Sequence, residues 1–146
     1  QTNHPALLAA HRDGGHRSAP RTGARRLSEQ RPGDKAPLNV LVQINTSNED
    51  SKSGVRPDAA PELMAAISEL PGLRLRGLMT LPAATTNQTE QRKPFRQLQE
   101  LISQLSDSMP QLDTLSMGMS GDLEAAVSEG ANIVRVGTDI FGARYN

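Results

Sequence analysis

Two short turns late in the sequence combine glycine with a hydroxyl side chain. The first is Gly118-Met119-Ser120-Gly121-Asp122, and the second is Gly137-Thr138. Free backbone N–H groups in such turns, the hydroxyls of Ser120 and Thr138 and the start of a following helix together favour the binding of a phosphate. The alternative is that Ser120 only caps the helix after it, which is a common role for serine.

The elements around these turns are expected to bring them together. Residues 115–117 and 133–136 predict strands, and residues 122–129 carry apolar side chains at helical spacing. Gly130 can end that helix in a left-handed conformation. Parallel strands joined by a right-handed helix place the two turns side by side at one sheet edge. A further helical turn is expected at 139–141.

The preceding sequence repeats the same alternation of strand and helix. Residues 38–44 alternate between the two faces of a largely buried strand, and residues 73–81 predict another strand. Residues 58–70 and 95–105 predict helices, with a polar loop at 85–91. This alternation predicts an α/β fold with a parallel sheet covered by helices.

Binding residues of such folds lie at the carboxyl ends of the strands, so four strand ends supply the candidates. These are Asn45, Met79, Met119 with Ser120, and Gly137 with Thr138. Arg135 lies inside the last predicted strand, where a buried cation needs a partner. We expect Arg135 to point toward a ligand at this edge; the alternative is a salt bridge to a helix carboxylate.

The composition argues against several other kinds of site. The 146 residues include no cysteine, which excludes disulfides and thiolate metal ligands. Formal net charge is zero and aromatic residues are scarce, so we expect no nucleic-acid partner. With no membrane-length apolar run and no signal peptide, we expect no membrane partner and a cytoplasmic protein. The spacing of His4, His11 and His16 suits no metal site.

Residues 1–36 differ from the rest of the chain. They hold seven Lys/Arg against three Asp/Glu. Residues 6–10 could begin a helix, whereas residues 12–26 have so few apolar side chains that we expect a solvated loop. The alternative is a basic arm that contacts phosphates.

Three segments resemble the pyridoxal phosphate homeostasis protein family. They read LNVLVQINTSNEDSKSGV, LRLRGLMTLP and LSMGMSGDLEAAVSEGANIVRVGTDIFGARYN. The resemblance covers residues 37–146 closely and residues 1–36 more faintly. Members are single-domain barrels similar to the N-terminal domain of alanine racemase. The resemblance therefore implies the C-terminal half of a (β/α)8 TIM-like barrel of the fold-type III PLP-binding class.

The resemblance also implies a ligand, pyridoxal 5′-phosphate (PLP). Ser120, Gly137 and Thr138 would hold the phosphate, Met119 would pack near the ring, and Arg135 would lie beside the pyridine, which it keeps largely unprotonated. Members of the family are regarded as cofactor carriers or regulators of vitamin B6 pools, so PLP homeostasis without catalysis is implied. An alanine-racemase-like enzyme and a nonfunctional fragment of a longer gene remain the alternatives.

The sequence departs from the family pattern in its first part. The family's Schiff-base lysine lies at the end of the first barrel strand, and this chain begins after the third, so we expect PLP to be bound noncovalently. Lys52, on the ligand side, is the alternative amine. We expect residues 1–36 to be a degraded or poorly ordered remnant of the fourth barrel unit and residues 37–146 to form the half-barrel.

Half a barrel has a physical cost. Inward apolar residues, for which we take Val40, Val42 and Leu78, would lose their opposing layer, and two strand edges would stay unpaired. The exposed apolar surface predicts marginal stability and self-association through those edges.

Overall fold

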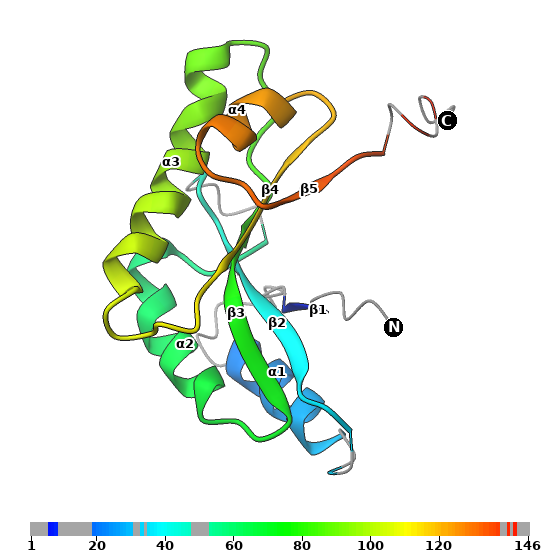
Figure 1. Ribbon diagram of the computed structural model, residues 1–146, viewed down its shortest axis with the longest axis vertical. Helices are drawn as coiled ribbons and strands as arrows, with labels where there is room; N and C mark the ends of the chain where they lie inside the picture. Colours follow the sequence, from blue (N-terminus) through cyan, green and yellow to red (C-terminus); the bar gives the residue numbers. More distant parts are fainter. Residues whose placement is uncertain are drawn as a thin grey trace.

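The described part of the chain is an open parallel sheet with helices on one of its faces (Figure 1). The computed structural model describes residues 6–8, 19–30, 33, 35–47, 53–137, 140 and 142. Within them, five strands lie in the order β1-β2-β3-β4-β5, and every neighbouring pair is parallel. The predicted α/β class with parallel strands is therefore confirmed, in the arrangement of part of a β/α barrel.

The elements follow one another with short connections. In chain order they are β1 (Ala6–Leu8), α1 (Ala19–Glu29), β2 (Leu38–Ile44), the 3-10 turn η1 (Pro57–Ala59), α2 (Ala60–Ser68), β3 (Leu73–Thr80), α3 (Gln88–Leu105), β4 (Thr114–Met119), α4 (Leu123–Ser128) and β5 (Ile133–Arg135). None of the helices in the described ranges is both long and apolar enough to cross a membrane.

The main core lies between the sheet and the helices. Phe95 and Leu98 of α3, with Met64 of α2, are fully buried there against the strands. Ala24 of α1 and Ala126 of α4 belong to the same cluster, so each described helix covers the same side of the sheet. Burial of this apolar surface is the main stabilising contribution to the fold.

The opposite face of the sheet is more polar than predicted. Val40, Val42 and Leu78 lie in the helix-side core with at most 1% of their surface exposed, so the expectation that they face inward is wrong. Alternate residues of a strand point to opposite faces, so the other face carries Asn39, Leu41 and Gln43 of β2 and Asn45 just after its end. Three of these four are polar, which weakens the argument that a large apolar layer is left uncovered.

Strand β3 contains one extra residue. Val40 pairs with Leu75 and Leu41 pairs with Gly77, which leaves Arg76 without a partner in β2. As a result, Leu75 and Leu78 both reach the helix-side core although they are three positions apart. The Arg76 side chain turns to Asp113, where its Nε donates to Oδ1 over 2.8 Å.

Two sequence predictions for the first part of the chain are wrong. Residues 6–8 form strand β1, which pairs with β2, in place of the expected helix. Helix α1 occupies the second half of the expected loop at 12–26 and extends to Glu29. Tertiary packing explains the helix, because Ala24 is fully buried and Leu27 packs against the core. Ser28 also ties α1 to the α2–β3 turn by donating to the Pro71 carbonyl.

Helix α3 begins earlier than predicted. The loop expected at 85–91 ends at Asn87, whose side chain accepts hydrogen bonds from the N–H groups of Thr89 and Glu90. Asparagine is a favourable N-cap residue, so the helix starts at Gln88 although this stretch is polar.

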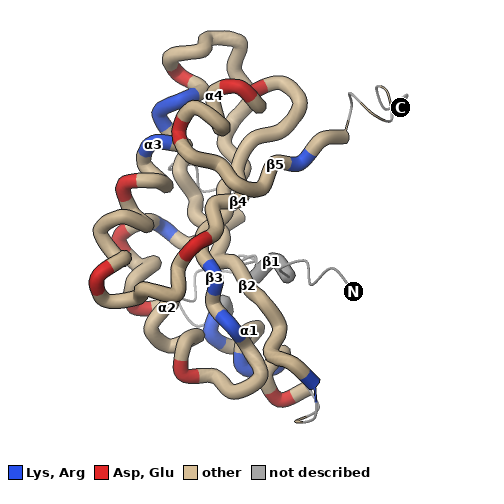
Figure 2. Tube along the Cα trace, in the orientation of Figure 1, with Lys and Arg blue, Asp and Glu red and all other residues tan. Residues whose placement is uncertain are grey.

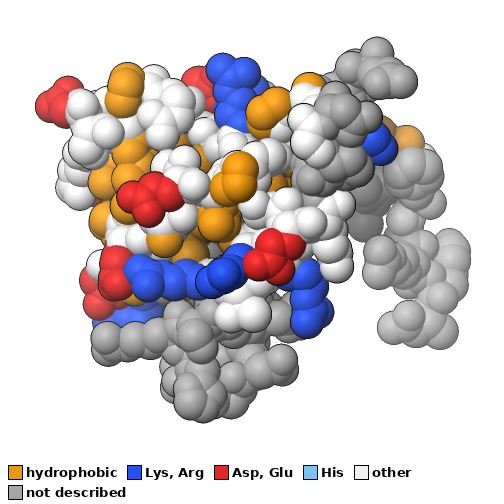
Figure 3. Space-filling model, turned by 90° about the horizontal axis from the view of Figure 1, so that it is seen from below, with side chains coloured by type: hydrophobic (Ala, Val, Ile, Leu, Met, Phe, Trp, Pro, Cys, Tyr) orange, Lys and Arg blue, Asp and Glu red, His pale blue; other side chains and the backbone are white. Residues whose placement is uncertain are grey.

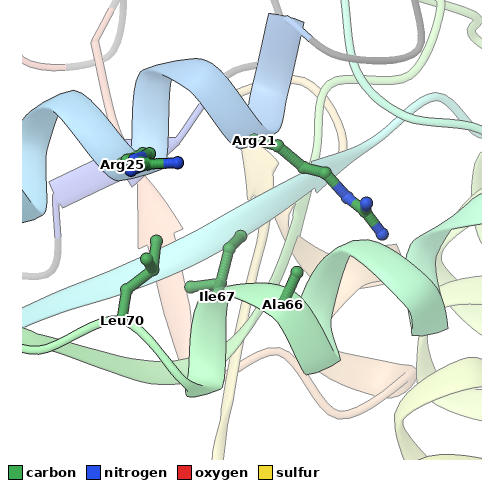
Figure 4. Close-up of a pocket in the computed structure, with 5 residues that line it drawn as sticks. All are labelled: Arg21, Arg25, Ala66, Ile67 and Leu70. Carbon is green, nitrogen blue, oxygen red and sulfur yellow. The ribbon is translucent and has the colours of Figure 1, made fainter.

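Two hollows among the described residues lie away from the carboxyl ends of the strands. One, of about 120 Å³, separates α1 from α2 and is lined by Arg21, Arg25, Ala66, Ile67 and Leu70 (Figure 4). The other lies between the end of α3 and the start of β4 and includes Leu112 and Asp113. The molecule seen from below, toward the amino ends of the strands, shows apolar side chains between charged ones (Figure 3).

Candidate functional site

The turn after β4 is shaped by one glycine and one aspartate. Gly118 has φ of +92°, and a Cβ there would lie 2.5 Å from the Cβ of Ala126 in α4, so the position requires glycine. The Asp122 Oδ1 atom accepts from the Met119 N–H over 2.6 Å, and the Asp122 N–H donates to the Met119 carbonyl. These contacts close residues 119–122 into a tight turn before α4.

Ser120 sits inside this turn without acting as a helix cap. The N-cap position of α4 is Asp122, and its cap carries no side-chain hydrogen bond to the helix. The Ser120 hydroxyl oxygen is buried and has no partner among the described residues. A buried polar atom without a partner costs free energy, and in a native protein such an atom calls for a ligand or a water.

The second turn follows the neighbouring strand. Met119 pairs with Arg135, so the ends of β4 and β5 lie side by side. Gly137 comes two residues later, and its carbonyl accepts from the Ile140 N–H. A Cβ on Gly137 would meet nothing within 4 Å, so the space beside its Cα is open. Thr138, the other predicted residue of this turn, lies outside the described residues, as do Asp139 and Phe141.

Arg135 reaches from β5 across the end of β4 to β3. Its Nη2 donates to the Thr80 carbonyl over 2.9 Å, while its Nε is buried and has no partner among the described residues. Pairing between β3 and β4 stops at Met79 and Ser116, which leaves the Thr80 carbonyl beyond the ladder. Burial lowers the pKa of Arg135, and the nearby charge of Asp122 acts in the opposite direction.

Thr80 is itself held by β2. Its hydroxyl donates to the Ile44 carbonyl over 3.0 Å and lies 2.8 Å from the hydroxyl oxygen of Thr46. A hydroxyl has a single proton, so Thr46 is the donor in the second contact. Arg135 is therefore connected to β2 through Thr80, whose carbonyl accepts from Arg135 and whose hydroxyl contacts Ile44 and Thr46.

The predicted site residues in the described part of the chain lie at the carboxyl ends of the strands, but two of them are buried. Met119 is 48% exposed at this edge, next to Ser120. Met79 is buried, so its neighbour Thr80 is the polar residue that β3 supplies. Asn45 is buried at the end of β2, where its Oδ1 accepts from the Ser47 N–H. Sequence reasoning missed Thr80, although a threonine at the end of an apolar strand is a visible signal for a polar contact.

The salt bridge considered for Arg135 does not occur among the described residues, whereas other arginines form such pairs elsewhere. Acidic and basic residues lie together where α3 passes α4 (Figure 2). There Glu129 accepts from Arg92 over 2.6 Å and from Arg96 over 3.0 Å. Hydrogen bonding from Arg96, followed by that from Arg92, lowers the pKa of Glu129. This pair of contacts fastens α4 to α3 and so supports the turn that carries Ser120.

The geometry fits a ligand that carries both an anionic group and a hydrogen-bond acceptor atom. The Ser120 hydroxyl and Gly137, which has open space beside its Cα, lie at adjacent strand ends and suit a phosphate. Arg135 offers a desolvated, unpartnered N–H close by, which suits an acceptor atom on the same ligand. PLP has both features, a phosphate and a pyridine nitrogen, so the residues present fit it.

Comparison with known proteins identifies the family of the chain. The chain matches the family profile described as "Alanine racemase, N-terminal domain" over residues 21–145. A relative from Vibrio cholerae called "Pyridoxal phosphate homeostasis protein" is 51% identical over 144 residues, which are 99% of this chain and 61% of the relative. The chain thus spans about three fifths of the length of such curated relatives.

Solved structures give the same result. PipY of Synechococcus elongatus, solved without PLP, superposes with a TM-score of 0.72 at 31% identity, covering 82% of this chain and 56% of PipY. The same protein with PLP bound gives a TM-score of 0.67 at 28% identity, covering 86% and 55%. The resemblance noted in the sequence is therefore confirmed, and the chain belongs to the alanine racemase N-terminal domain family.

Proposed function

We propose that this chain binds PLP at the carboxyl ends of β4 and β5 and serves in PLP homeostasis. The observation that carries the proposal is the pair of buried, unpartnered polar atoms at this edge, the Ser120 hydroxyl oxygen and the Arg135 Nε. The names of the curated relatives and the PLP-bound structure of PipY support the choice of ligand.

Each residue has a separate task in the proposed complex. Ser120 donates its hydroxyl proton to the phosphate, and Gly137, with Thr138, presents backbone N–H groups to the same group. Arg135 directs an N–H to the pyridine nitrogen and, as a cation, keeps that nitrogen from holding a proton. Met119 covers the ring with its exposed thioether chain. PLP, when bound, supplies an aldehyde and an aromatic ring that can take up electrons.

Binding in this proposal is noncovalent and the chain is not a catalyst. Support for the absence of catalysis comes from the relatives, which are named for homeostasis. Lys52, the alternative amine, lies outside the described residues. Borohydride treatment of the PLP-loaded chain followed by mass spectrometry tests this directly, because an adduct on Lys52 would refute noncovalent binding. Racemisation of L-alanine by the loaded chain would refute the absence of catalysis.

The proposal is tested by PLP binding to matched serine variants. Ser120→Ala removes the hydroxyl from the turn, and Ser128→Ala removes one from α4, where it donates only to the Glu124 carbonyl. A hydrogen bond to a charged group contributes about 1.5–3 kcal/mol, so Ser120→Ala should weaken PLP binding by about tenfold or more. Ser128→Ala should bind like the wild type. Equal PLP affinity in Ser120→Ala and wild type would refute the site.

A further inference from the structure

Gln91, in the first turns of α3, contacts the turn that carries Ser120. Its side-chain nitrogen donates to the Gly121 carbonyl over 3.1 Å and to the Thr85 carbonyl over 2.6 Å. Gly121 immediately follows Ser120, and Thr85 belongs to the loop between β3 and α3. One side chain therefore joins the two loops that follow β3 and β4.

The chemistry of the contact fixes which end of the amide lies between the loops. Both partners are carbonyl oxygens, so only the NH2 end of Gln91 can serve them, and each of its two protons is used. A side chain of the same shape without these protons would place an acceptor against two acceptors. The position therefore needs a donor in addition to the right size.

Helix α3 gives Gln91 a firm base. Asn87 caps the helix with two side-chain hydrogen bonds, and the Gln91 N–H donates to the Asn87 carbonyl. Phe95, one turn further on, is fully buried in the core. The Arg92 and Arg96 contacts to Glu129 tie the same part of α3 to α4. Gln91 thus extends from a well-anchored helix to the turn that carries Ser120.

We propose that Gln91 is a positioning residue for the anion site: it holds the 119–122 turn so that the Ser120 hydroxyl is aimed at a ligand phosphate. The inference rests on the proposed function for its ligand. Asp122 closes the turn from within through the Met119 N–H, and Gln91 holds it from outside through the Gly121 carbonyl. Removal of Gln91 leaves the turn closed but takes away its direct hydrogen bond to α3.

The first test needs no ligand. Amide hydrogen exchange is measured for residues 119–122 in the wild type, in Gln91→Leu and in the control Gln99→Leu. Gln99 lies on the same helix, and its amide donates to the Ser103 hydroxyl, away from the turn. We expect exchange in the turn to become about tenfold faster in Gln91→Leu and to stay unchanged in Gln99→Leu. Unchanged exchange in Gln91→Leu would overturn the inference.

The second test uses inorganic phosphate and PLP as probes. Gln91→Leu should weaken the binding of phosphate and of PLP by about three- to tenfold, because both ligands place a phosphate group at the Ser120 turn. Gln91→Glu, which keeps the shape and loses both protons, should weaken phosphate binding more than the matched charge change Gln99→Glu. Faster exchange with unchanged phosphate affinity would also overturn the inference.

The two tests separate this inference from the proposed function. If the wild-type chain binds neither PLP nor phosphate, the proposed function is refuted and the role of Gln91 toward an anion falls with it. If PLP binds in the wild type and Gln91→Leu affects neither exchange nor affinity, only the inference about Gln91 is refuted. Both Gln91 variants change a partly exposed side chain, and circular dichroism confirms that they fold before the comparison is made.

Discussion

Replacing Gly77 by alanine should damage the sheet more than any surface change of the same size. A Cβ on Gly77 would lie 1.8 Å from the carbonyl oxygen of Thr114 and 2.7 Å from its carbonyl carbon. Cβ atoms essentially never come closer than 3.0 Å to another heavy atom, so β3 and β4 would have to separate by roughly 1 Å. The obstacle is backbone, so no side-chain rotation can relieve it.

The size of the effect follows from what that separation removes. Overpacking of this kind costs about 1–3 kcal/mol, and loss of the neighbouring hydrogen bond from the Asp113 N–H to the Arg76 carbonyl costs about 1 kcal/mol more. We expect a loss of about 3 kcal/mol in the free energy of unfolding. With a urea m-value of about 2 kcal/mol/M, the unfolding midpoint should fall by about 1.5 M.

Urea unfolding followed by circular dichroism measures this change, with Gly23→Ala as the matched control. Gly23 lies inside α1 and a Cβ there would meet nothing within 4 Å. Alanine is the better helix former, so Gly23→Ala should raise the stability by up to about 1 kcal/mol. A midpoint for Gly77→Ala within about 0.3 M of the wild type would refute the reasoning, because it would mean that β3 and β4 separate at little cost.

Three further results are expected. The pKa of Glu129 is lowered below its ordinary 4.5, so its contribution to stability is present above that pH and is lost as the pH falls through the depressed value. When the free energy of unfolding is measured as a function of pH, Glu129→Gln should be less stable than the wild type at neutral pH, and the two should become equally stable in acid. Thr80→Val removes the hydroxyl bonded to Ile44 and Thr46 and should weaken PLP binding severalfold by fluorescence titration, whereas Thr80→Ser should restore it. Gly118→Ala places a Cβ 2.5 Å from Ala126 at a positive φ and should lower both the thermal midpoint and phosphate affinity; normal affinity in this variant would contradict the role of the turn.

The strands and helices after residue 37 were largely predictable because their patterns are local. In β2, the alternation of Val40 and Val42 with Asn39 and Gln43 predicts the strand. The apolar pair lies on one face of the sheet and the polar pair on the other, as strand geometry requires. The pattern does not say which face meets the helices. A barrel interior was assumed to be the apolar side, and the structure has the helix side apolar instead.

Elements that depend on distant contacts were missed. Helix α1 is rich in arginine, and its stability comes from contacts that the sequence does not display, such as the salt bridge from Arg21 to Glu62. The early start of α3 depends on the cap at Asn87, within a stretch that otherwise reads as loop. Local composition is a weak guide where tertiary packing decides the conformation.

The candidate site was likewise only partly predictable from the sequence. The glycine and serine of the β4 turn and the position of Arg135 at the end of β5 could be predicted, because they follow strands that are recognisable in sequence. Thr80 left only the signal of a threonine at the end of an apolar strand, and Gln91 could not be predicted, because it acts through a contact with Gly121, 30 positions away. Side chains that support a site from neighbouring elements leave no spacing rule in the sequence.

The extra residue in β3 sets the phase of everything that follows it in the strand. Before Arg76 the odd-numbered residues face the helices, and after it the even-numbered Leu78 does. If Arg76 instead took its place in a regular ladder, the last part of β3 would turn over, with Leu78 on the polar side and Met79 facing the helices. The outer end of the strand, and with it the Thr80 carbonyl that Arg135 contacts, keeps its orientation because Arg76 stays outside the ladder with β2.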